Sequence, residues 1–297
     1  MVQKNSLKKV IVIVGPTGVG KTKLSIDVAK KYNLEIINCD QSQMRKDLNI
    51  GTAKITKDEM NGVKHHLLDF LDSISDYSIK DFQDDARYII DNMETIPLIV
   101  GGSGLYIDAL ITDYDLNNEK RDDDLEDQYQ TLSNEELYQK LFELNPEAAK
   151  KTHPNNRKRV LRYLQIVLEK GTIESKPNLP YYDSLIIFLN KDREILYQNI
   201  NIRCDQMIQN GWIEEVQNLI SNNVDIEKIK EIGYKDLKQY LDNEITLEEA
   251  TDNIKKETRH YAKRQITWFK NKMDCIEIEN DAFAFEKVCN FIDDFLK

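Results

Sequence analysis

A glycine-rich segment near the start of the chain, residues 15–22, contains the residue types that bind phosphate. It reads Gly-Pro-Thr-Gly-Val-Gly-Lys-Thr and fits GxxxxGK followed by Ser or Thr, the pattern of a phosphate-binding loop. Glycines permit a tight turn whose backbone N–H groups surround an anion, while Lys21 can neutralise the anion and Thr22 can ligate Mg²⁺. The pattern predicts a site for a diphosphate or triphosphate and leaves open what is transferred.

A carboxylate follows shortly after this loop, in the segment Asn-Cys-Asp-Gln-Ser-Gln at residues 38–43. Asp40 comes directly after an apolar run typical of a strand, and parallel sheets bind ligands at the carboxyl ends of their strands. A carboxylate at that edge could hold Mg²⁺ through water, or it could accept a proton from a nucleophile. The residues alone do not decide between these roles.

The elements that must position these groups follow an alternating pattern of strands and helices. Apolar, β-branched runs at 9–14, 34–38 and 97–102 are separated by segments with helical periodicity, such as 21–31 and 78–93. This alternation predicts an α/β fold with a P-loop NTPase-like parallel sheet flanked by helices. Further strands are expected at 184–190 and 275–279, with helices starting after Asp192 and Thr246.

Composition and charge set the limits for the rest of the chain. The 297 residues, 40% of them hydrophobic, are enough for one large core, residues 1–112 and 183–297, carrying an all-helical insertion domain at 113–182. No apolar run is long enough for a membrane span and no secretory signal is evident, so we expect a cytoplasmic protein with free thiols. The net charge of −11 conceals two basic segments, 151–176 and 255–272, which leave an anionic partner possible.

Nine segments along the chain identify a family when they are taken together. In order they are GPTGVGKT, CDQSQ, NIGTAK, VKHHLLD, PLIVGGSGLY, HPNNRKRVLR, DREILYQNINIRCDQM, EIGYKDL and TRHYAKRQITWF. This set resembles, over nearly the whole chain, the motifs of the tRNA dimethylallyltransferases of bacterial type. The chain departs from the family pattern at Gln41, where serine is usual, at Arg45, where tyrosine is common, and at Ser103, where threonine is more frequent.

The resemblance implies an activity and a set of site residues. The activity is transfer of a dimethylallyl group from dimethylallyl diphosphate to N6 of the tRNA adenosine on the 3′ side of the anticodon, with release of diphosphate and with Mg²⁺ as cofactor. The implied catalytic residues are Asp40, as the base that accepts the N6 proton, Lys21, and Thr22, which also holds the metal. The implied diphosphate-binding residues are Gly15, Pro16, Thr17, Gly18, Val19, Gly20, Lys21, Thr22, Ser103 and Lys235.

The resemblance also implies contacts with the anticodon stem-loop of tRNA, whose target adenine must leave the base stack to react. The implied tRNA-binding residues are Asp40, Gln41, Ser42, Gln43, Ser103, Lys158, Arg159, Val160, Leu161, Arg162, Lys256, Arg259 and Lys263. We expect a monomer whose partners are tRNA and dimethylallyl diphosphate, with no membrane contact.

Three other functions share part of this pattern. A P-loop kinase acting on a small molecule or nucleotide would use the same loop, with residues 157–162 as a lid over the phosphates. An isopentenyltransferase acting on free adenine nucleotides would use the loop and Asp40, but it has no need of a basic surface the size of a tRNA. A nucleotide-regulated binding module would use the loop as a switch and would not need Asp40.

Overall fold

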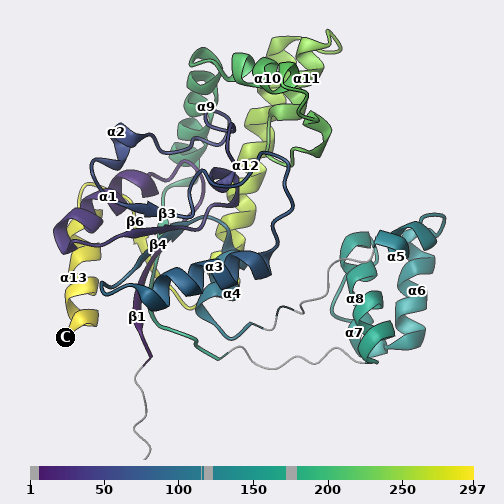
Figure 1. Ribbon diagram of the computed structural model, residues 1–297, viewed down its shortest axis with the longest axis horizontal. Coiled ribbons are helices and arrows are strands. Elements are labelled where there is room, and N and C mark those ends of the chain that lie inside the picture. Colours follow the sequence, from purple (N-terminus) through teal and green to yellow (C-terminus); the bar gives the residue numbers. More distant parts are fainter. Residues whose placement is uncertain (1–6, 115, 117–122, 172–178) are drawn as a thin grey trace, which may run out of the picture. The chain divides into compact units, whose positions relative to one another are not determined.

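The computed structural model of the protein describes residues 7–114, 116, 123–171 and 179–297 (Figure 1). They fall into two compact units, one drawn from residues 1–115 and 179–297 and the other from residues 116–178. The predicted domain boundaries, after residues 112 and 182, lie a few residues from these limits. Residues just past 178 belong to the larger unit, where the Asp113 N–H donates to the Leu179 carbonyl at 2.8 Å and Tyr182 is buried.

The larger unit is built on a parallel sheet of six strands in the order β3-β2-β4-β1-β5-β6. The strands are β1 (Lys9–Val14), β2 (Ile36–Asn38), β3 (His65–His66), β4 (Leu98–Gly101), β5 (Asp183–Asn190) and β6 (Ile276–Glu279). Strand β1 lies inside the sheet and its residues from Val10 to Val14 are fully buried, because a parallel strand covered on both faces is apolar throughout. The predicted α/β fold is confirmed.

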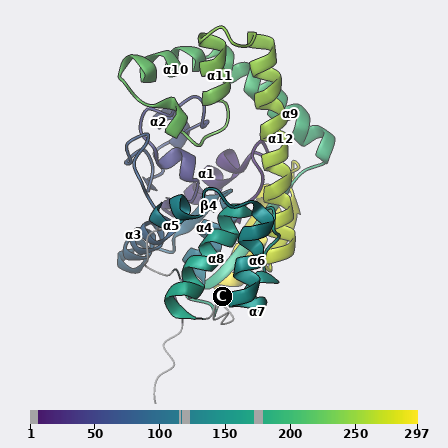
Figure 2. The same ribbon diagram turned by 90° about the vertical axis from the view of Figure 1, so that its right-hand side faces the viewer.

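Helices connect these strands and extend beyond the sheet. They are α1 (Lys21–Tyr32), α2 (Lys57–Met60), α3 (Ile79–Asn92), α4 (Gly104–Ile111), α9 (Arg193–Gln209), α10 (Trp212–Ser221), α11 (Tyr234–Leu241), α12 (Leu247–Lys272) and α13 (Ala284–Leu296), with 3₁₀ turns η1 (Gln41–Met44) and η2 (Ile226–Lys228). Helix α11 lies beside the amino-terminal end of the long helix α12, and α10 packs on α11 (Figures 1 and 2). Within the described residues, no helix has the length and apolarity needed to cross a membrane.

Each face of the sheet has its own apolar layer. Ile11 and Ile13 point into a cluster shared with α1, α9, α13 and the first half of α12. Val12 and Val14 point the other way, into a cluster with α3, α4 and Phe269 from the far end of α12. Helix α12 therefore reaches both layers, and it passes the edge of the sheet where the strands β1, β2 and β4 end.

Reciprocal side-chain caps begin three of the helices. Ser78, Ser133 and Thr246 each accept a hydrogen bond from the backbone three residues on, and the side chain at that later position returns the contact. This reciprocal arrangement satisfies backbone N–H groups that have no partner within the helix. The predicted helix start after Thr246 is confirmed.

The smaller unit is helical where the structure describes it. It contains α5 (Asp123–Gln128), α6 (Asn134–Leu144), α7 (Pro146–Ala149) and α8 (Arg157–Lys170). Leu137 and Leu141 of α6 pack with Val160 and Leu164 of α8 in a core separate from that of the sheet. Helix α8 ends at Gly171, whose φ of 73° lies in the left-handed region that glycine adopts without strain.

Candidate active site

The glycine-rich loop joins the end of β1 to the start of α1. Gly18 and Gly20 have φ values of 81° and 94°, in the left-handed region that side chains disfavour, so the loop needs glycine at both positions. Gly20 caps α1 without a side chain, which leaves the first N–H groups of that helix available to an anion. The ammonium group of Lys21 lies across the loop and donates to the carbonyls of Gly15, at 2.8 Å, and Pro16, at 3.0 Å.

Side chains from distant elements hold the loop in place. Gln265 of α12 accepts from the N–H of Thr17 and donates to the carbonyl of Gly102, both at 2.9 Å. Arg203 of α9 donates to the hydroxyl of Thr17. Asn280, just after β6, donates to the carbonyl of Val19 at 2.6 Å.

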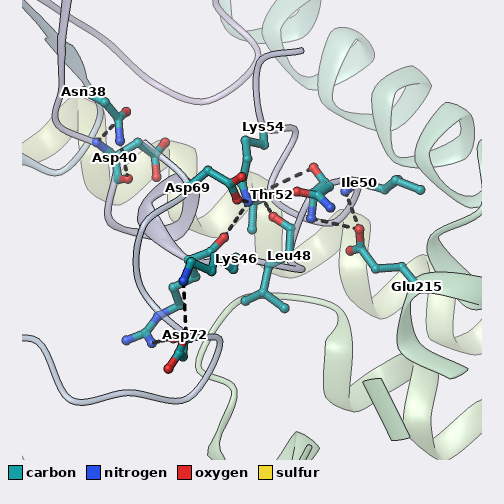
Figure 3. Close-up of polar contacts among 12 residues, drawn as sticks. Asn38, Asp40, Lys46, Leu48, Ile50, Thr52, Lys54, Asp69, Asp72 and Glu215 are labelled. Atoms are coloured by element: carbon teal, nitrogen blue, oxygen red, sulfur yellow. Dashed lines mark hydrogen bonds and ion pairs between the residues drawn. The ribbon is translucent and has the colours of Figure 1, made fainter. Parts of the chain in front are cut away.

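Asp40 lies where β2 ends and the 3₁₀ turn η1 begins. Its carboxylate accepts from the N–H of Ser42 at 3.1 Å, and its own N–H donates to Asn38 Oδ1 at 3.2 Å (Figure 3). Asn38 also donates to the carbonyl of Leu67 at 2.8 Å. These bonds fix the carboxylate at the carboxyl end of its strand, on the edge where the sequence predicted it.

A single cavity of about 370 Å³ brings the loop and Asp40 together. Its lining residues are Thr17, Gly18, Gly20, Lys21, Thr22, Asp40, Gln43, Thr52, Ala53, Asn199, Ile202, Arg203, Gln206, Tyr261 and Gln265. The cavity thus combines an anion-binding loop, two cationic side chains and one carboxylate. Such a set can hold a diphosphate next to a group that loses a proton.

The charged groups of the cavity shift one another's protonation. Burial lowers the pKa of Lys21 to about 8, although the nearby Asp40 carboxylate acts in the opposite direction and Arg203 lowers it further. Burial raises the pKa of Asp40, and the positive charge of Lys21 limits that rise. Both groups are therefore more readily neutralised than exposed ones, as is common in sites that exchange protons.

Ser103 lies next to this cavity, at the junction of β4 and α4. Its side chain hydrogen-bonds to Tyr261, a cavity residue whose pKa burial raises to about 12. Its neighbours Gly101 and Gly102 have no space for a side chain: an added Cβ would lie 2.1 Å from the Cys39 carbonyl oxygen and 2.2 Å from Gln265 Nε2, respectively. The glycines of this motif therefore serve close packing.

Arg45, five residues after Asp40, is buried. Its guanidinium donates to the carbonyls of Asp72, Ser73 and Ser75 and lies 3.3 Å from Glu231. Both side chains of this ion pair are only 7% exposed. A buried charge and the acid that neutralises it thus stand at a position where the resemblance implies tyrosine.

The structure places other predicted residues away from the cavity. Lys235 of α11 is half-exposed and pairs with Glu227 at 3.3 Å, and it does not line the cavity that the phosphate loop forms. The side chains of Val160 and Leu161 are buried in the core of the smaller unit, and contact of these two residues with tRNA stays a prediction. Their apolar groups pack α8 against α6.

The basic residues predicted to contact tRNA differ in exposure. Lys158 and Arg159 on α8 are exposed, as are Lys256 and Lys263 on α12. Arg162 is half-buried and donates to Gln165 at 2.8 Å, and Arg259 is half-buried and donates to Asn201 at 2.6 Å. Of the predicted turn residues, Gln43 lines the cavity, whereas Gln41 and Ser42 are half-buried beside it.

Sequence reasoning missed the residues that α9 and α12 bring to the site, Arg203 and Gln265. Gln265 falls on the same helical stripe as the apolar Ala262 and Phe269, and all three are buried. A polar residue on an apolar stripe was the available signal, because buried amides require hydrogen-bond partners. For Arg203 the only sequence signal is its place in the motif at residues 192–207.

The sheet, the loop between β1 and α1 and the cavity at the carboxyl ends of the strands define a P-loop-like α/β protein. The model of the IPP transferase family matches residues 43–272. Because this match covers more than half of the chain, the chain belongs to the IPP transferase family.

Relatives at 40–44% identity extend this assignment over most of the chain. The chain is 43% identical over 280 residues to the tRNA dimethylallyltransferase of Bacillus mycoides, covering 90% of this chain and 88% of that protein. It is 44% identical over 283 residues to the tRNA dimethylallyltransferase of Bacillus subtilis, covering 91% and 90%.

Solved structures show the same fold. The full-length tRNA isopentenylpyrophosphate transferase of Bacillus halodurans matches with a TM-score of 0.75 at 40% identity, covering 97% of both chains. A eukaryotic dimethylallyltransferase acting on tRNA matches with a TM-score of 0.85 at 30% identity, covering 97% of this chain and 79% of that one.

Proposed function

We propose that this protein transfers the dimethylallyl group of dimethylallyl diphosphate to N6 of the tRNA adenosine on the 3′ side of the anticodon and releases diphosphate. The observation that carries the proposal is the single cavity lined by both the phosphate loop and Asp40, in a chain of the IPP transferase family. The relatives named above are tRNA dimethylallyltransferases, which supports the same substrate class for this chain.

In the proposed reaction, N6 of adenine forms a bond to the allylic carbon while the bond from that carbon to the diphosphate oxygen breaks. The electron pair of the broken bond leaves with diphosphate, and the N6 proton passes to the Asp40 carboxylate. The N6 amino group is a weak nucleophile because its lone pair is delocalised into the ring. A carboxylate within hydrogen-bond reach therefore helps the attack.

The phosphate loop binds the leaving group in this scheme. Backbone N–H groups of residues 15–22 and the first turn of α1 surround the diphosphate, and Lys21 exchanges its two carbonyl contacts for diphosphate oxygens. Arg203, which the structure adds to the predicted set, lines the same cavity and supplies a second positive charge. These groups stabilise the negative charge that develops on the departing oxygen.

The oxygen ligands available at the loop suit a Mg²⁺ ion. Thr22 is exposed at the start of α1 and lines the cavity with Asp40, and the described residues contain no cluster of three His, Cys, Asp or Glu that could hold a metal without the substrate. Mg²⁺ keeps several waters and is held by few protein groups plus substrate phosphates. Thr22 would hold the ion, which would supply charge neutralisation for the diphosphate.

Exposed basic side chains support tRNA as the acceptor. Lys158 and Arg159 in the smaller unit, and Lys256 and Lys263 in the larger, are exposed, as contact with the phosphates of an anticodon stem-loop requires. The target adenine must leave its stack to enter the cavity. A free nucleotide acceptor would need no basic surface outside the cavity.

The test is incubation of the purified protein and Mg²⁺ with labelled dimethylallyl diphosphate and unmodified tRNA, with parallel reactions that offer AMP or ATP instead of tRNA. Label in tRNA adenine alone supports the proposal. Label in AMP or ATP would replace it with a nucleotide prenyltransferase. Phosphate transfer from ATP without prenyl transfer would replace it with a kinase.

A further inference from the structure

The segment that follows the 3₁₀ turn η1 forms one wall of the cavity. Residues 47–54 include the motif Asn-Ile-Gly-Thr-Ala-Lys, and two of its residues, Thr52 and Ala53, line the cavity. The Gln43 amide donates to the carbonyl of Ala53 at 3.1 Å, and the Gln43 N–H donates to the carbonyl of Asp40 at 3.1 Å. The wall is therefore joined directly to the turn that carries Asp40.

The carboxylate of Glu215 on α10 binds the backbone of this wall and does not itself line the cavity. It accepts from three consecutive backbone N–H groups, those of Asn49 at 2.8 Å, Ile50 at 2.7 Å and Gly51 at 3.1 Å. Figure 3 shows Glu215 beside Ile50. Hydrogen bonds to an ionised acceptor are about twice as strong as those between neutral groups. Because the three N–H groups belong to adjacent residues, a single side chain fixes the course of the backbone just before Thr52.

The motif Glu-Ile-Gly-Tyr-Lys-Asp-Leu completes the same assembly. The hydroxyl of Tyr234 donates to Glu215 at 2.7 Å, and burial together with this carboxylate raises the pKa of Tyr234, so the phenol keeps its proton at neutral pH. Trp212 lies between the two motifs: a Cβ added at Gly51 would be 2.2 Å from its ring, and one added at Gly233 would be 2.3 Å away. Two glycines thus allow both segments to pack on one indole.

We propose that Glu215 is a positioning residue for prenyl transfer. Its carboxylate fixes the position of the wall formed by Thr52 and Ala53, and the wall in turn fixes the position of Gln43 relative to Asp40. This inference rests on the proposed function, because it assigns the wall to the side of the cavity that receives the acceptor adenine. In the proposed function diphosphate binds to the loop after β1, and none of the hydrogen bonds that hold the wall involves that loop. Loss of the Glu215 carboxylate should therefore impair the reaction with the acceptor adenine and leave the binding of diphosphate unchanged.

The adjacent residue on α10 provides a matched control. Glu214 has the same charge on the same helix, is exposed, and takes no part in the hydrogen bonds that hold the wall. Glu215→Gln keeps the size of the side chain but removes the charge and turns an NH₂ group toward N–H donors. Tyr32→Phe controls for stability, since it removes a hydrogen bond of 2.7 Å to Asp293 between α1 and α13.

The experiment measures kcat/KM for unmodified tRNA and, by calorimetry, the Kd of inorganic diphosphate with Mg²⁺ for the wild type and the three variants. We expect Glu215→Gln to lower kcat/KM at least tenfold with a diphosphate Kd within about twofold of wild type, and the Glu214→Gln and Tyr32→Phe variants to keep wild-type activity.

Two results would overturn the inference. Wild-type kcat/KM in Glu215→Gln would mean that the wall does not depend on this carboxylate. Equal loss of activity and of diphosphate binding would mean that the substitution disturbs the whole site. A wild-type protein that does not prenylate tRNA would instead refute the proposed function, so the two failures are distinguishable.

Discussion

The lowered pKa of Lys21 predicts how the binding of dimethylallyl diphosphate depends on pH. Burial brings this pKa to about 8 in the ligand-free protein, and only the protonated ammonium neutralises diphosphate. The protonated fraction falls from about 90% at pH 7 to about 3% at pH 9.5 for a pKa of about 8. The affinity for dimethylallyl diphosphate should therefore fall about 30-fold between pH 7 and 9.5, with most of the loss above pH 8.

The assay is titration of dimethylallyl diphosphate into the protein at half-unit steps of pH, with Lys21→Arg as the comparison. Arginine stays protonated throughout this range, so its affinity, whatever its absolute value, should change little with pH. Tyr261, whose pKa is raised to about 12, keeps its proton under the same conditions. A flat profile for the wild type, or an equal decline for Lys21→Arg, would refute the role given to Lys21.

Three further predictions follow from the site and its surroundings. Asp40→Asn should lower kcat by about 10²- to 10⁴-fold, the usual contribution of a general base, while the Kd for tRNA in a filter-binding assay stays within twofold; unchanged kcat would exclude Asp40 as the base. Charge reversal at Arg159 and Arg162 should weaken tRNA binding and reduce the slope of log K for tRNA binding against log salt concentration by about 1.5. An unaltered slope would exclude these two residues from the tRNA-binding surface. Glu231→Ala should lower the free energy of unfolding in urea by about 3–5 kcal/mol, because it leaves the Arg45 charge buried without its partner; a loss below about 1 kcal/mol would contradict that account.

Local sequence signals predicted much of the fold. The β-branched run at residues 9–14 forms a strand that is fully buried from Val10 to Val14, and Asp192 and Thr246 cap the helices expected to start after them. The order of the strands could not be predicted in the same way. Strand β1 pairs with β4 and β5, which follow it by many residues, and no local pattern specifies such distant partners.

The candidate site was predictable to the extent that one rule of parallel sheets applies. Lys21 and Asp40 meet in one cavity because β1 and β2 both end at the same edge. Arg203 and Gln265 come from helices that cross this edge, and the sequence does not show where a helix crosses a sheet. Lys235 belongs to a motif that does pack near the site, but its side chain turns outward to Glu227.

The buried ion pair between Arg45 and Glu231 has an evolutionary consequence. A relative with tyrosine at position 45 has no charge there to neutralise, so an acid at position 231 is useful only together with arginine. Either change alone gives a chain with a lone buried charge, at a cost of about 3–5 kcal/mol out of a total stability of about 5–15 kcal/mol. The two positions should therefore change together among relatives, as a compensated pair that a lineage gains or loses as a unit.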